Sequence, residues 1–207
     1  MVSRRGDALR EHILQTAKRV FLETGFERAS MDEVAKRAST SKRSLYAHFE
    51  SKEKLFLEVI ELVRGLFLGR LGEPVGADPI ETLTAYCARY LEGMIFEPSI
   101  QLLQMTLAET ERFPEAAARH HDVIFVEVGK RISAYLRAAL GVSSKTGIDA
   151  AQRMIALVLH PQFTRALFGQ GDLVKRFDPH GLSPKIDVRA VRRAVTDVVE
   201  PLGKAQR

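Results

Sequence analysis

The sequence predicts an all-α protein, with a small helical domain at the N-terminus and a larger helical domain after it. Apolar residues recur with the 3.6-residue period of an α-helix along most of the 207 residues. No segment alternates apolar and polar residues over the length of a strand. Capping residues and Gly or Pro breaks separate the periodic segments, and their number indicates about nine helices.

The first two helices are expected within residues 9–38. Gly25 lies just after the apolar stripe of the first helix, and glycine commonly terminates a helix. Ser30 is placed to cap the second helix, and Glu33, three residues later, completes a capping box with it. The stripe of the first helix consists of Leu9, Ile13, Ala17, Val20 and Phe21.

A break at 39–41, Ser-Thr-Ser, separates the second helix from a third short one that ends near His48. Ser51 then begins a fourth helix, over 51–71, which has a wide apolar face. Three short helices with such a break between the second and third form a helix-turn-helix unit. In that unit the third helix enters the major groove of DNA, and residues at its N-terminal end reach base edges.

Hydrogen-bond donors are concentrated on the third helix, which suits contact with DNA. Basic and hydroxyl side chains fill its first turn, where backbone N–H groups also face phosphates. Arg43 or Lys42 is expected to read a base, and a phosphate contact or a solvated cation is the alternative for Arg43. Tyr46, His48 and Lys52 are expected to bind phosphate, whereas Ser30 is a helix cap first, with a phosphate contact as its second role. The full set of candidate DNA-binding residues is Ser30, Thr40, Ser41, Lys42, Arg43, Ser44, Tyr46, His48 and Lys52.

Net positive charge is concentrated in the same region. Residues 1–54 contain 12 basic and 8 acidic residues, whereas residues 55–207 contain 19 and 18. Nearly all of the chain's net charge of +5 therefore lies in the first quarter. A local basic patch favours a polyanionic partner, although basic N-termini also occur for other reasons.

These residues resemble the DNA-binding domain of the TetR/AcrR family of transcriptional repressors over residues 10–56. Two positions depart from the family pattern. Ser39 stands where the turn usually has glycine, so the turn must accept a side chain, and Arg43 stands where the reading helix often has glycine. The matching positions are Phe21, Gly25-Phe26, Ser30, Val34-Ala35, Ala38, Ser41, Leu45-Tyr46, His48-Phe49, Ser51-Lys52-Glu53 and Leu55.

The resemblance implies a homodimer in which the last two helices of each subunit form a four-helix bundle. Independently, apolar residues near the C-terminus follow the 3-4-3-4 spacing of an interhelical seam. An internal core is the alternative for this seam. Two reading helices imply a near-palindromic operator with half-sites about one helical turn apart. The seam residues are Val188, Val191, Val195, Val198 and Leu202.

The second domain is expected to bind an effector and to mediate dimerisation. We place the boundary at 54, so that residues 1–54 are the helix-turn-helix domain, residues 55–207 are the second domain, and the helix over 51–71 connects them. Further helices are expected over 79–94, 99–111, 114–140, 146–170 and 184–203. Part of this region resembles the C-terminal domain of AefR-like regulators. Candidates for the pocket, each with plain core as its alternative, are Phe67, Tyr86, Tyr90, Met94, Met105, Phe125, Met154 and Phe163.

Three further residues were considered for special roles. Cys87 is the single cysteine and is expected to be a small buried residue rather than a redox sensor. His120 and His121 are adjacent, so on a helix they point about 100° apart and rarely share one metal ion. We therefore expect no metal site and no cofactor, and the special roles of these residues stay open.

The function predicted from the sequence is sequence-specific binding of double-stranded operator DNA by a homodimer. A small lipophilic or aromatic ligand, not identified by the sequence, is expected to release this repressor; a ligand-independent regulator or activator of the same fold is the alternative. No grouping of catalytic residues is apparent, so an enzyme is not expected. No apolar run reaches membrane-spanning length and no signal peptide is evident, so a cytoplasmic protein without a membrane partner is expected.

Overall fold

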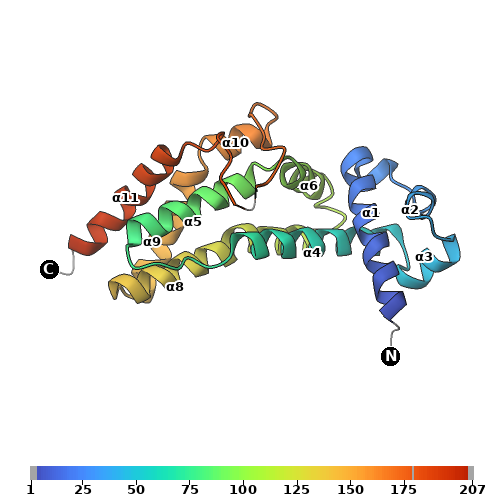
Figure 1. The fold of residues 1–207 in the computed structure, drawn as a ribbon, viewed down its shortest axis with the longest axis horizontal. Helices are drawn as coiled ribbons and strands as arrows, with labels where there is room; N and C mark the ends of the chain where they lie inside the picture. The colour runs from blue at the N-terminus through green and yellow to red at the C-terminus, as the bar shows by residue number, and fades with distance from the viewer. Residues whose placement is uncertain (1–3, 179, 205–207) are drawn as a thin grey trace. The chain divides into compact units, whose positions relative to one another are not determined.

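Every regular element that the computed structural model shows in the residues it describes, 4–178 and 180–204, is helical (Figure 1). The all-α prediction is confirmed. Within these residues, an isolated β-bridge joins Phe96 and Val174. The helices are α1 (Arg4–Arg28), α2 (Met31–Arg37), α3 (Lys42–His48), α4 (Lys52–Leu71), α5 (Pro79–Met94), α6 (Glu97–Ala108), α7 (Pro114–His121), the π-helical η1 (Asp122–Glu127), α8 (Val128–Leu140), α9 (Ser144–Leu159), α10 (Gln162–Leu167) and α11 (Val188–Lys204).

The described residues form two compact units. Unit 1 contains residues 4–66 and 101–117, and unit 2 contains residues 67–100, 118–178 and 180–204. The compact unit around the expected helix-turn-helix thus extends past residue 54 and includes a second, distant segment of the chain. The boundaries between the units fall inside α4, α6 and α7.

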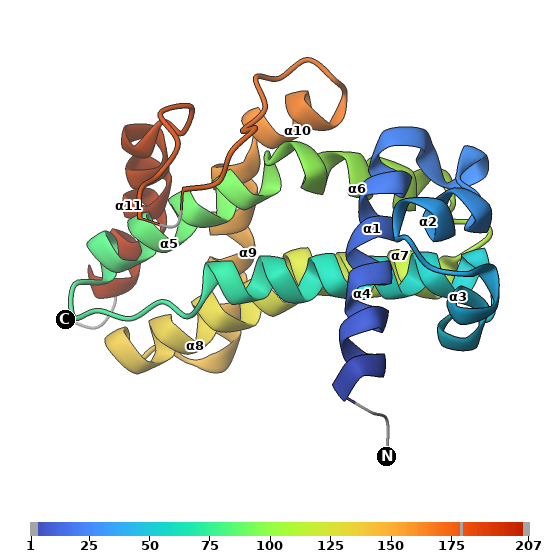
Figure 2. The ribbon, with the colours of Figure 1, turned by 45° about the vertical axis from the view of Figure 1, so that its right-hand side comes forward.

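The core of unit 1 is built from α1 to α4 together with residues 101–117. Ile13, Ala17 and Phe21 of the predicted α1 stripe are fully buried. Leu102 and Ala116 join the same buried cluster, although they lie far away in the sequence. Figure 2 shows α2 and α3 beside α1. The apolar stripe of α1 therefore meets partners from both segments of unit 1.

Three hydroxyl caps fix where the short helices of unit 1 begin. The backbone N–H of Glu33 donates to Ser30 Oγ at 3.1 Å, and that of Ser44 donates to Ser41 Oγ at 3.1 Å. The N–H of Lys54 donates to Ser51 Oγ at 3.2 Å at the start of α4. Each cap satisfies a backbone donor that the helix itself leaves unpaired. The caps predicted at Ser30 and Ser51 are confirmed, and Ser41 is the cap of α3.

In unit 2, α5 packs against α9 and α11, and α8 packs against α9. The α8–α9 crossing is close because Gly147 has no side chain. A Cβ at residue 147 would lie 2.8 Å from Ser133 Oγ and 3.3 Å from the Ser133 carbonyl oxygen. Gly141, with φ 65°, ends α8 in the left-handed conformation that glycine adopts readily.

Two of the helices expected from the sequence are divided in the structure. The helix expected over 114–140 consists of α7, η1 and α8, because the backbone takes wider π-helical turns between Asp122 and Glu127. The helix expected over 146–170 stops at Leu159 and resumes as α10 after Pro161. Proline has no N–H to continue the hydrogen-bond ladder, which accounts for this break.

The apolar stripe of α11 is internal core, which corrects the expected dimer seam. Val191, Val195 and Val198 are 2%, 0% and 4% exposed, because α11 packs on α5 and α9 of its own chain. These three valines are therefore not available to a second subunit. Val188 is 42% exposed and Leu202 is half-buried, so they remain accessible.

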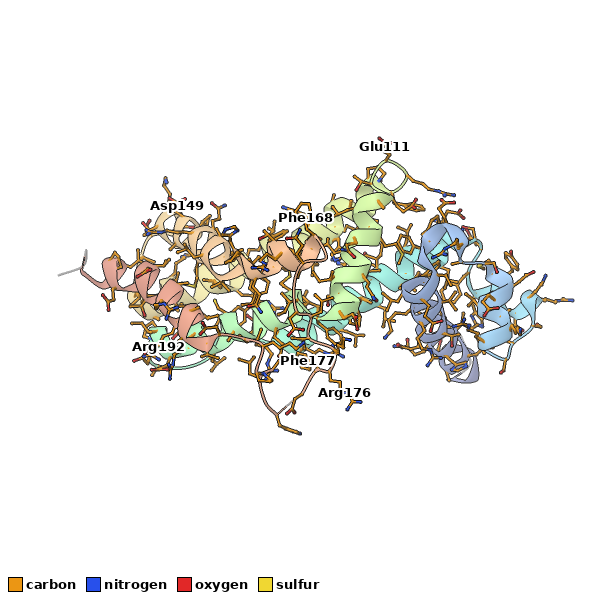
Figure 3. All side chains as sticks on the ribbon, turned by 90° about the horizontal axis from the view of Figure 1, so that it is seen from above. Glu111, Asp149, Phe168, Arg176, Phe177 and Arg192 are labelled. Atoms are coloured by element: carbon orange, nitrogen blue, oxygen red, sulfur yellow. The ribbon has the colours of Figure 1, made fainter. Side chains whose placement is uncertain are left out.

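A long connection between α10 and α11 is held on α5. The Glu92 side chain is fully buried and accepts hydrogen bonds from Arg89 Nη1 at 2.6 Å and from the Ser183 N–H at 2.7 Å. The guanidinium carbons of Arg70 and Arg89 each lie 4.9 Å from the centre of the Phe177 ring. In Figure 3 Phe177 lies against the helices, while its neighbour Arg176 projects outward. One ring and one buried carboxylate thus order this connection.

Cys87 is fully buried, and burial raises the pKa of its thiol to about 12. A protonated, inaccessible thiol is a poor nucleophile. The expectation of a small buried residue is confirmed.

No helix in residues 4–178 and 180–204 has both the length and the apolar character that crossing a membrane requires.

Candidate nucleic-acid interface

The third helix is anchored by apolar residues on one side and presents polar ones on the other. Leu45 is fully buried and Phe49, just past the helix end, is 2% exposed. Arg43 and Tyr46 are exposed, and their spacing of three residues places them on one face of the helix. The outward face of α3 is therefore free to enter a groove while its inner face stays in the core.

The turn before α3 carries the side chain of Ser39 at the position where the family pattern usually has glycine. Ser39 has φ 50°, in the left-handed region, which costs a residue with a Cβ about 1–2 kcal/mol. Hydrogen bonds hold the turn: the Ser39 N–H donates to the Lys36 carbonyl at 3.1 Å, and the Thr40 N–H donates to the Ala35 carbonyl at 3.0 Å. The expectation that this turn accepts a side chain is confirmed.

The two cations in the first turn of α3 differ in their surroundings. Lys42 Nζ lies 2.7 Å from Asp32 Oδ2, and both side chains are more than 60% exposed. Such a surface pair is worth little and separates easily. Among the described residues, Arg43 has no hydrogen-bonding or ion-pairing partner and is exposed. Arg43 is therefore the better placed of the two to make new contacts.

The remaining candidates on α2 and α3 have mixed roles. Ser30 and Ser41 act as helix caps, and Ser41 Oγ also donates to Ser44 Oγ at 3.1 Å. Thr40 and His48 are half-buried, and the His48 ring centre lies 6.4 Å from that of Phe49. Of the predicted residues on these helices, Lys42, Arg43 and Tyr46 are exposed and have long side chains that carry a donor at the tip.

Lys52, which is expected at a phosphate, is held inside unit 1 in the free chain. Its Nζ donates to the carbonyl oxygens of Phe26 at 2.9 Å and Glu27 at 3.1 Å, and lies 4.4 Å from the centre of the Phe26 ring. A lysine in the first turn of α4 faces the unfavourable positive end of the helix dipole. That mismatch in the sequence was a signal that Lys52 has another, stabilising partner.

Arg112, which is not among the residues predicted from the sequence, lies over the same Phe26 ring as Lys52. Its Nη1 pairs with Glu27 and its Nη2 with Glu53, both at 2.9 Å, and its guanidinium carbon lies 4.8 Å from the centre of the Phe26 ring. The pKa of Glu53 is lowered, mainly by hydrogen bonds from its own N–H and from Ser51, and further by the charge of Arg112. No sequence pattern joins residues this far apart.

The expected effector residues are divided between the two units. Tyr86, Tyr90, Met94, Met154 and Phe163 are buried in unit 2, with exposed fractions of 0–6%. Phe67, also in unit 2, is half-buried, with its ring centre 6.2 Å from that of Tyr90, whose hydroxyl donates to the Ile124 carbonyl. Met105 belongs to unit 1, so it is not part of a pocket inside unit 2.

Phe125, the remaining candidate, lines a groove between η1–α8 and α9 in unit 2. The groove has a volume of about 610 Å³, within the range of ligand sites. Its lining combines apolar side chains with basic and neutral polar ones. Its lining residues are His121, Phe125, Val126, Gly129, Lys130, Ser133, Ala134, Arg137, Ser144, Ile148, Ala151, Gln152 and Ile155.

The histidine pair diverges as the helix geometry requires. His120 is 7% exposed, whereas His121 is exposed and lies 3.3 Å from the Asp122 carboxylate. Across the described ranges, no three His, Cys, Asp or Glu residues are grouped so that they could hold a metal ion.

Two family models match the chain. One, described as bacterial regulatory proteins, tetR family, matches residues 13–59, which include α2, α3 and the start of α4. The other, described as AefR-like transcriptional repressor, C-terminal domain, matches residues 81–196, more than half of the chain. Both parts of the resemblance drawn from the sequence are confirmed.

Curated relatives match part of the chain. The HTH-type transcriptional activator FasR of Mycolicibacterium smegmatis is 44% identical over 64 residues, which cover 28% of this chain and 29% of FasR. The HTH-type transcriptional regulator AcrR of Shigella flexneri is 34% identical over 98 residues, 45% of each chain. The chain thus spans less than half the length of these relatives.

Solved structures share the fold over nearly the whole chain. A putative tetR-family transcriptional regulator from Mesorhizobium loti has a TM-score of 0.71 at 20% identity, and the match covers 98% of both chains. At this identity the likeness concerns the fold, and it extends to both compact units.

Arg43→Ala is predicted to lower DNA affinity by about 1–3 kcal/mol and to relax the base preference at one position of each half-site. Arg43 is expected to read a base because its guanidinium is exposed and unpaired. Fluorescence anisotropy would check this, with an operator selected from random DNA and with single-base variants of that operator. Lys42→Ala is the control, with a more uniform loss; a uniform loss for Arg43→Ala would contradict base reading.

Lys52→Met is predicted to lower the free energy of unfolding by about 1–2 kcal/mol, because two carbonyl oxygens and a ring lose their cation. The salt dependence of DNA binding should stay unchanged. Denaturant unfolding and a salt titration measure the two effects. Lys54→Met, at an exposed position of the same turn, should change neither much. A salt slope reduced by about one for Lys52→Met would instead identify a phosphate contact.

Proposed function

Because the chain belongs to the tetR family of DNA-binding transcriptional regulators, with a C-terminal domain of the AefR-like type, we propose that it is a homodimeric repressor. A small lipophilic or aromatic ligand releases it from a near-palindromic operator. The family consists of transcriptional regulators and not of enzymes. The observation that carries the proposal is the outward face of α3, where Arg43 and Tyr46 project from a helix that Leu45 anchors in the core.

The contacts of α3 divide into two kinds in this proposal. Arg43 donates two hydrogen bonds to the O6 and N7 acceptors of a guanine, the pairing that its planar guanidinium fits best. Tyr46 and Lys42 donate to phosphate oxygens, which fix the position of the helix without reading sequence. Lys42 leaves Asp32 at little cost, because their pair is exposed to solvent.

Dimerisation places two copies of α3 on one face of the DNA. The two half-sites are then about one helical turn apart, and the operator repeats the two-fold symmetry of the protein. With the α11 valines buried in their own chain, the pairing surface uses other residues of unit 2. Leu157 on α9 and Val188 at the start of α11, which are 43% and 42% exposed, are apolar residues that contribute to this surface in the proposal.

Ligand release requires the ligand to favour a dimer that does not fit the operator. A tenfold release needs about 1.4 kcal/mol of difference in ligand affinity between the two forms. Repression is proposed because the repressor-type C-terminal model matches more than half of the chain. Activation is the second candidate, since FasR, which matches 28% of this chain, is described as an activator.

Selection of bound sites from a random pool of double-stranded DNA tests the proposal. The wild-type protein is expected to recover a near-palindrome, and the Arg43→Ala/Tyr46→Ala double variant is the control that should lose it. Recovery of no preferred sequence, with binding that depends on salt alone, would contradict specific regulation. A recovered operator placed before a reporter gene then separates repression from activation, by the direction in which deletion of the regulator changes expression.

A further inference from the structure

The groove between η1–α8 and α9 has a chemical character that the proposed function does not specify. Its apolar wall includes Phe125, Ile148 and Ile155, and Ile148 is 47% exposed in the single chain. Contact with an apolar molecule removes these side chains from water, which is favourable in free energy. A volume of about 610 Å³ accommodates a small organic molecule.

Every charged or titratable group that lines the groove is a base. These groups are His121, Lys130 and Arg137, and no Asp or Glu is among the lining residues. Their partners differ. Lys130 lies 3.3 Å from Glu127, and His121 lies 3.3 Å from Asp122. Arg137 is exposed and its guanidinium has no hydrogen-bonding or ion-pairing partner among the described residues, so it is available to a ligand.

We propose that this groove binds an amphipathic anion, with its apolar body against Phe125, Ile148 and Ile155 and its anionic group on Arg137. This anion is the class of effector to which the regulator responds, a statement that rests on the proposed function. Charge complementarity selects the anion, because a guanidinium pairs with a carboxylate or sulfonate through two parallel hydrogen bonds. A cation or a neutral molecule of the same size leaves that guanidinium without a partner.

Gly129 offers a way to fill the groove without disturbing the fold. A Cβ at residue 129 would have one neighbour within 4 Å, Ile155 Cδ1 at 3.7 Å, which is ordinary contact. Gly129→Leu therefore places a side chain in the groove and also raises the helix propensity of α8. This contrasts with Gly147, where a Cβ would meet Ser133 at 2.8 Å. Loss of ligand binding in Gly129→Leu is thus separable from loss of folding.

The test uses 2-naphthoate as probe, with 2-naphthamide as its neutral analogue and 2-naphthylmethylammonium as its cationic one. Binding to the full chain without DNA is followed by the methyl NMR signals of labelled isoleucine, which include Ile148 and Ile155. Naphthoate is expected to shift these two signals and to bind at least tenfold more tightly than either analogue. Arg137→Gln should weaken binding about tenfold, and Gly129→Leu should abolish it. Arg153→Gln, exposed on α9 but outside the groove, should leave it unchanged.

Four results would overturn the proposal. The first two are equal binding of the three probes and no binding of naphthoate at millimolar concentration. The third is binding that survives in Gly129→Leu. The fourth is a second copy of the chain in the groove, seen as Ile148 and Ile155 signals that change with protein concentration and resist the probe.

The link to regulation is tested with the operator recovered from the DNA pool. Naphthoate is expected to weaken operator binding by the wild-type protein and not by Gly129→Leu, whose own affinity for DNA should equal that of the wild type. Equal effects on both proteins, or no effect on either, would overturn the effector role. If no operator is recovered, the proposed function fails instead, whereas the NMR result stands by itself.

Discussion

The ring of Phe26 is the point at which the separate segments of unit 1 meet. Its centre lies 4.9 Å from the ring centre of Phe56 on α4 and 5.2 Å from that of Phe113, and Phe21 on α1 stacks at 6.1 Å. The cations of Lys52 and Arg112 lie over the same ring. Aromatic contacts and cation–π contacts of this kind each contribute about 0.5–1.5 kcal/mol. Five side chains thus fix one ring.

This cluster gives the reading helix a firm base. Phe49 at the end of α3 lies under the Arg10 guanidinium of α1, 5.0 Å from the ring centre, and Arg10 pairs with Glu58 of α4 at 2.6 Å. The α1 and α4 positions that hold α3 are themselves tied together at Phe26. Residues 101–117 belong to the same unit through Phe113 and Arg112. The orientation of α3 therefore depends on residues far from the helix-turn-helix in the sequence.

Local chemistry made much of the interface predictable. Ser30, Ser41 and Ser51 each cap a helix, and a cap acts within three residues, so the sequence alone places the starts of α2, α3 and α4. Contacts between distant segments were not predictable. The partners of Lys52 are backbone carbonyls at residues 26 and 27, and no sequence pattern around Lys52 indicates them.

The α11 valines show a second limit. Their 3-4 spacing indicates that one face of a helix is covered, and the spacing is the same whether the cover comes from the same chain or from another. The structure supplies α5 and α9 as that cover. Met105 was grouped with the effector residues for its apolar character, and only the fold shows that it belongs to unit 1. The apolar character of a residue indicates that its side chain is covered, but it does not indicate which residues cover it.

The dependence of the reading helix on the Phe26 cluster is the claim that most needs a measurement. Hydrogen–deuterium exchange on the full chain, with wild type, Phe113→Ala and the exposed control Leu107→Ala, measures it directly. We expect Phe113→Ala to lower the protection of α3 amides from Leu45 to Phe49, and Leu107→Ala to leave it unchanged. Equal protection of these amides in all three proteins would show that α3 is held without residues 101–117, and would contradict the claim.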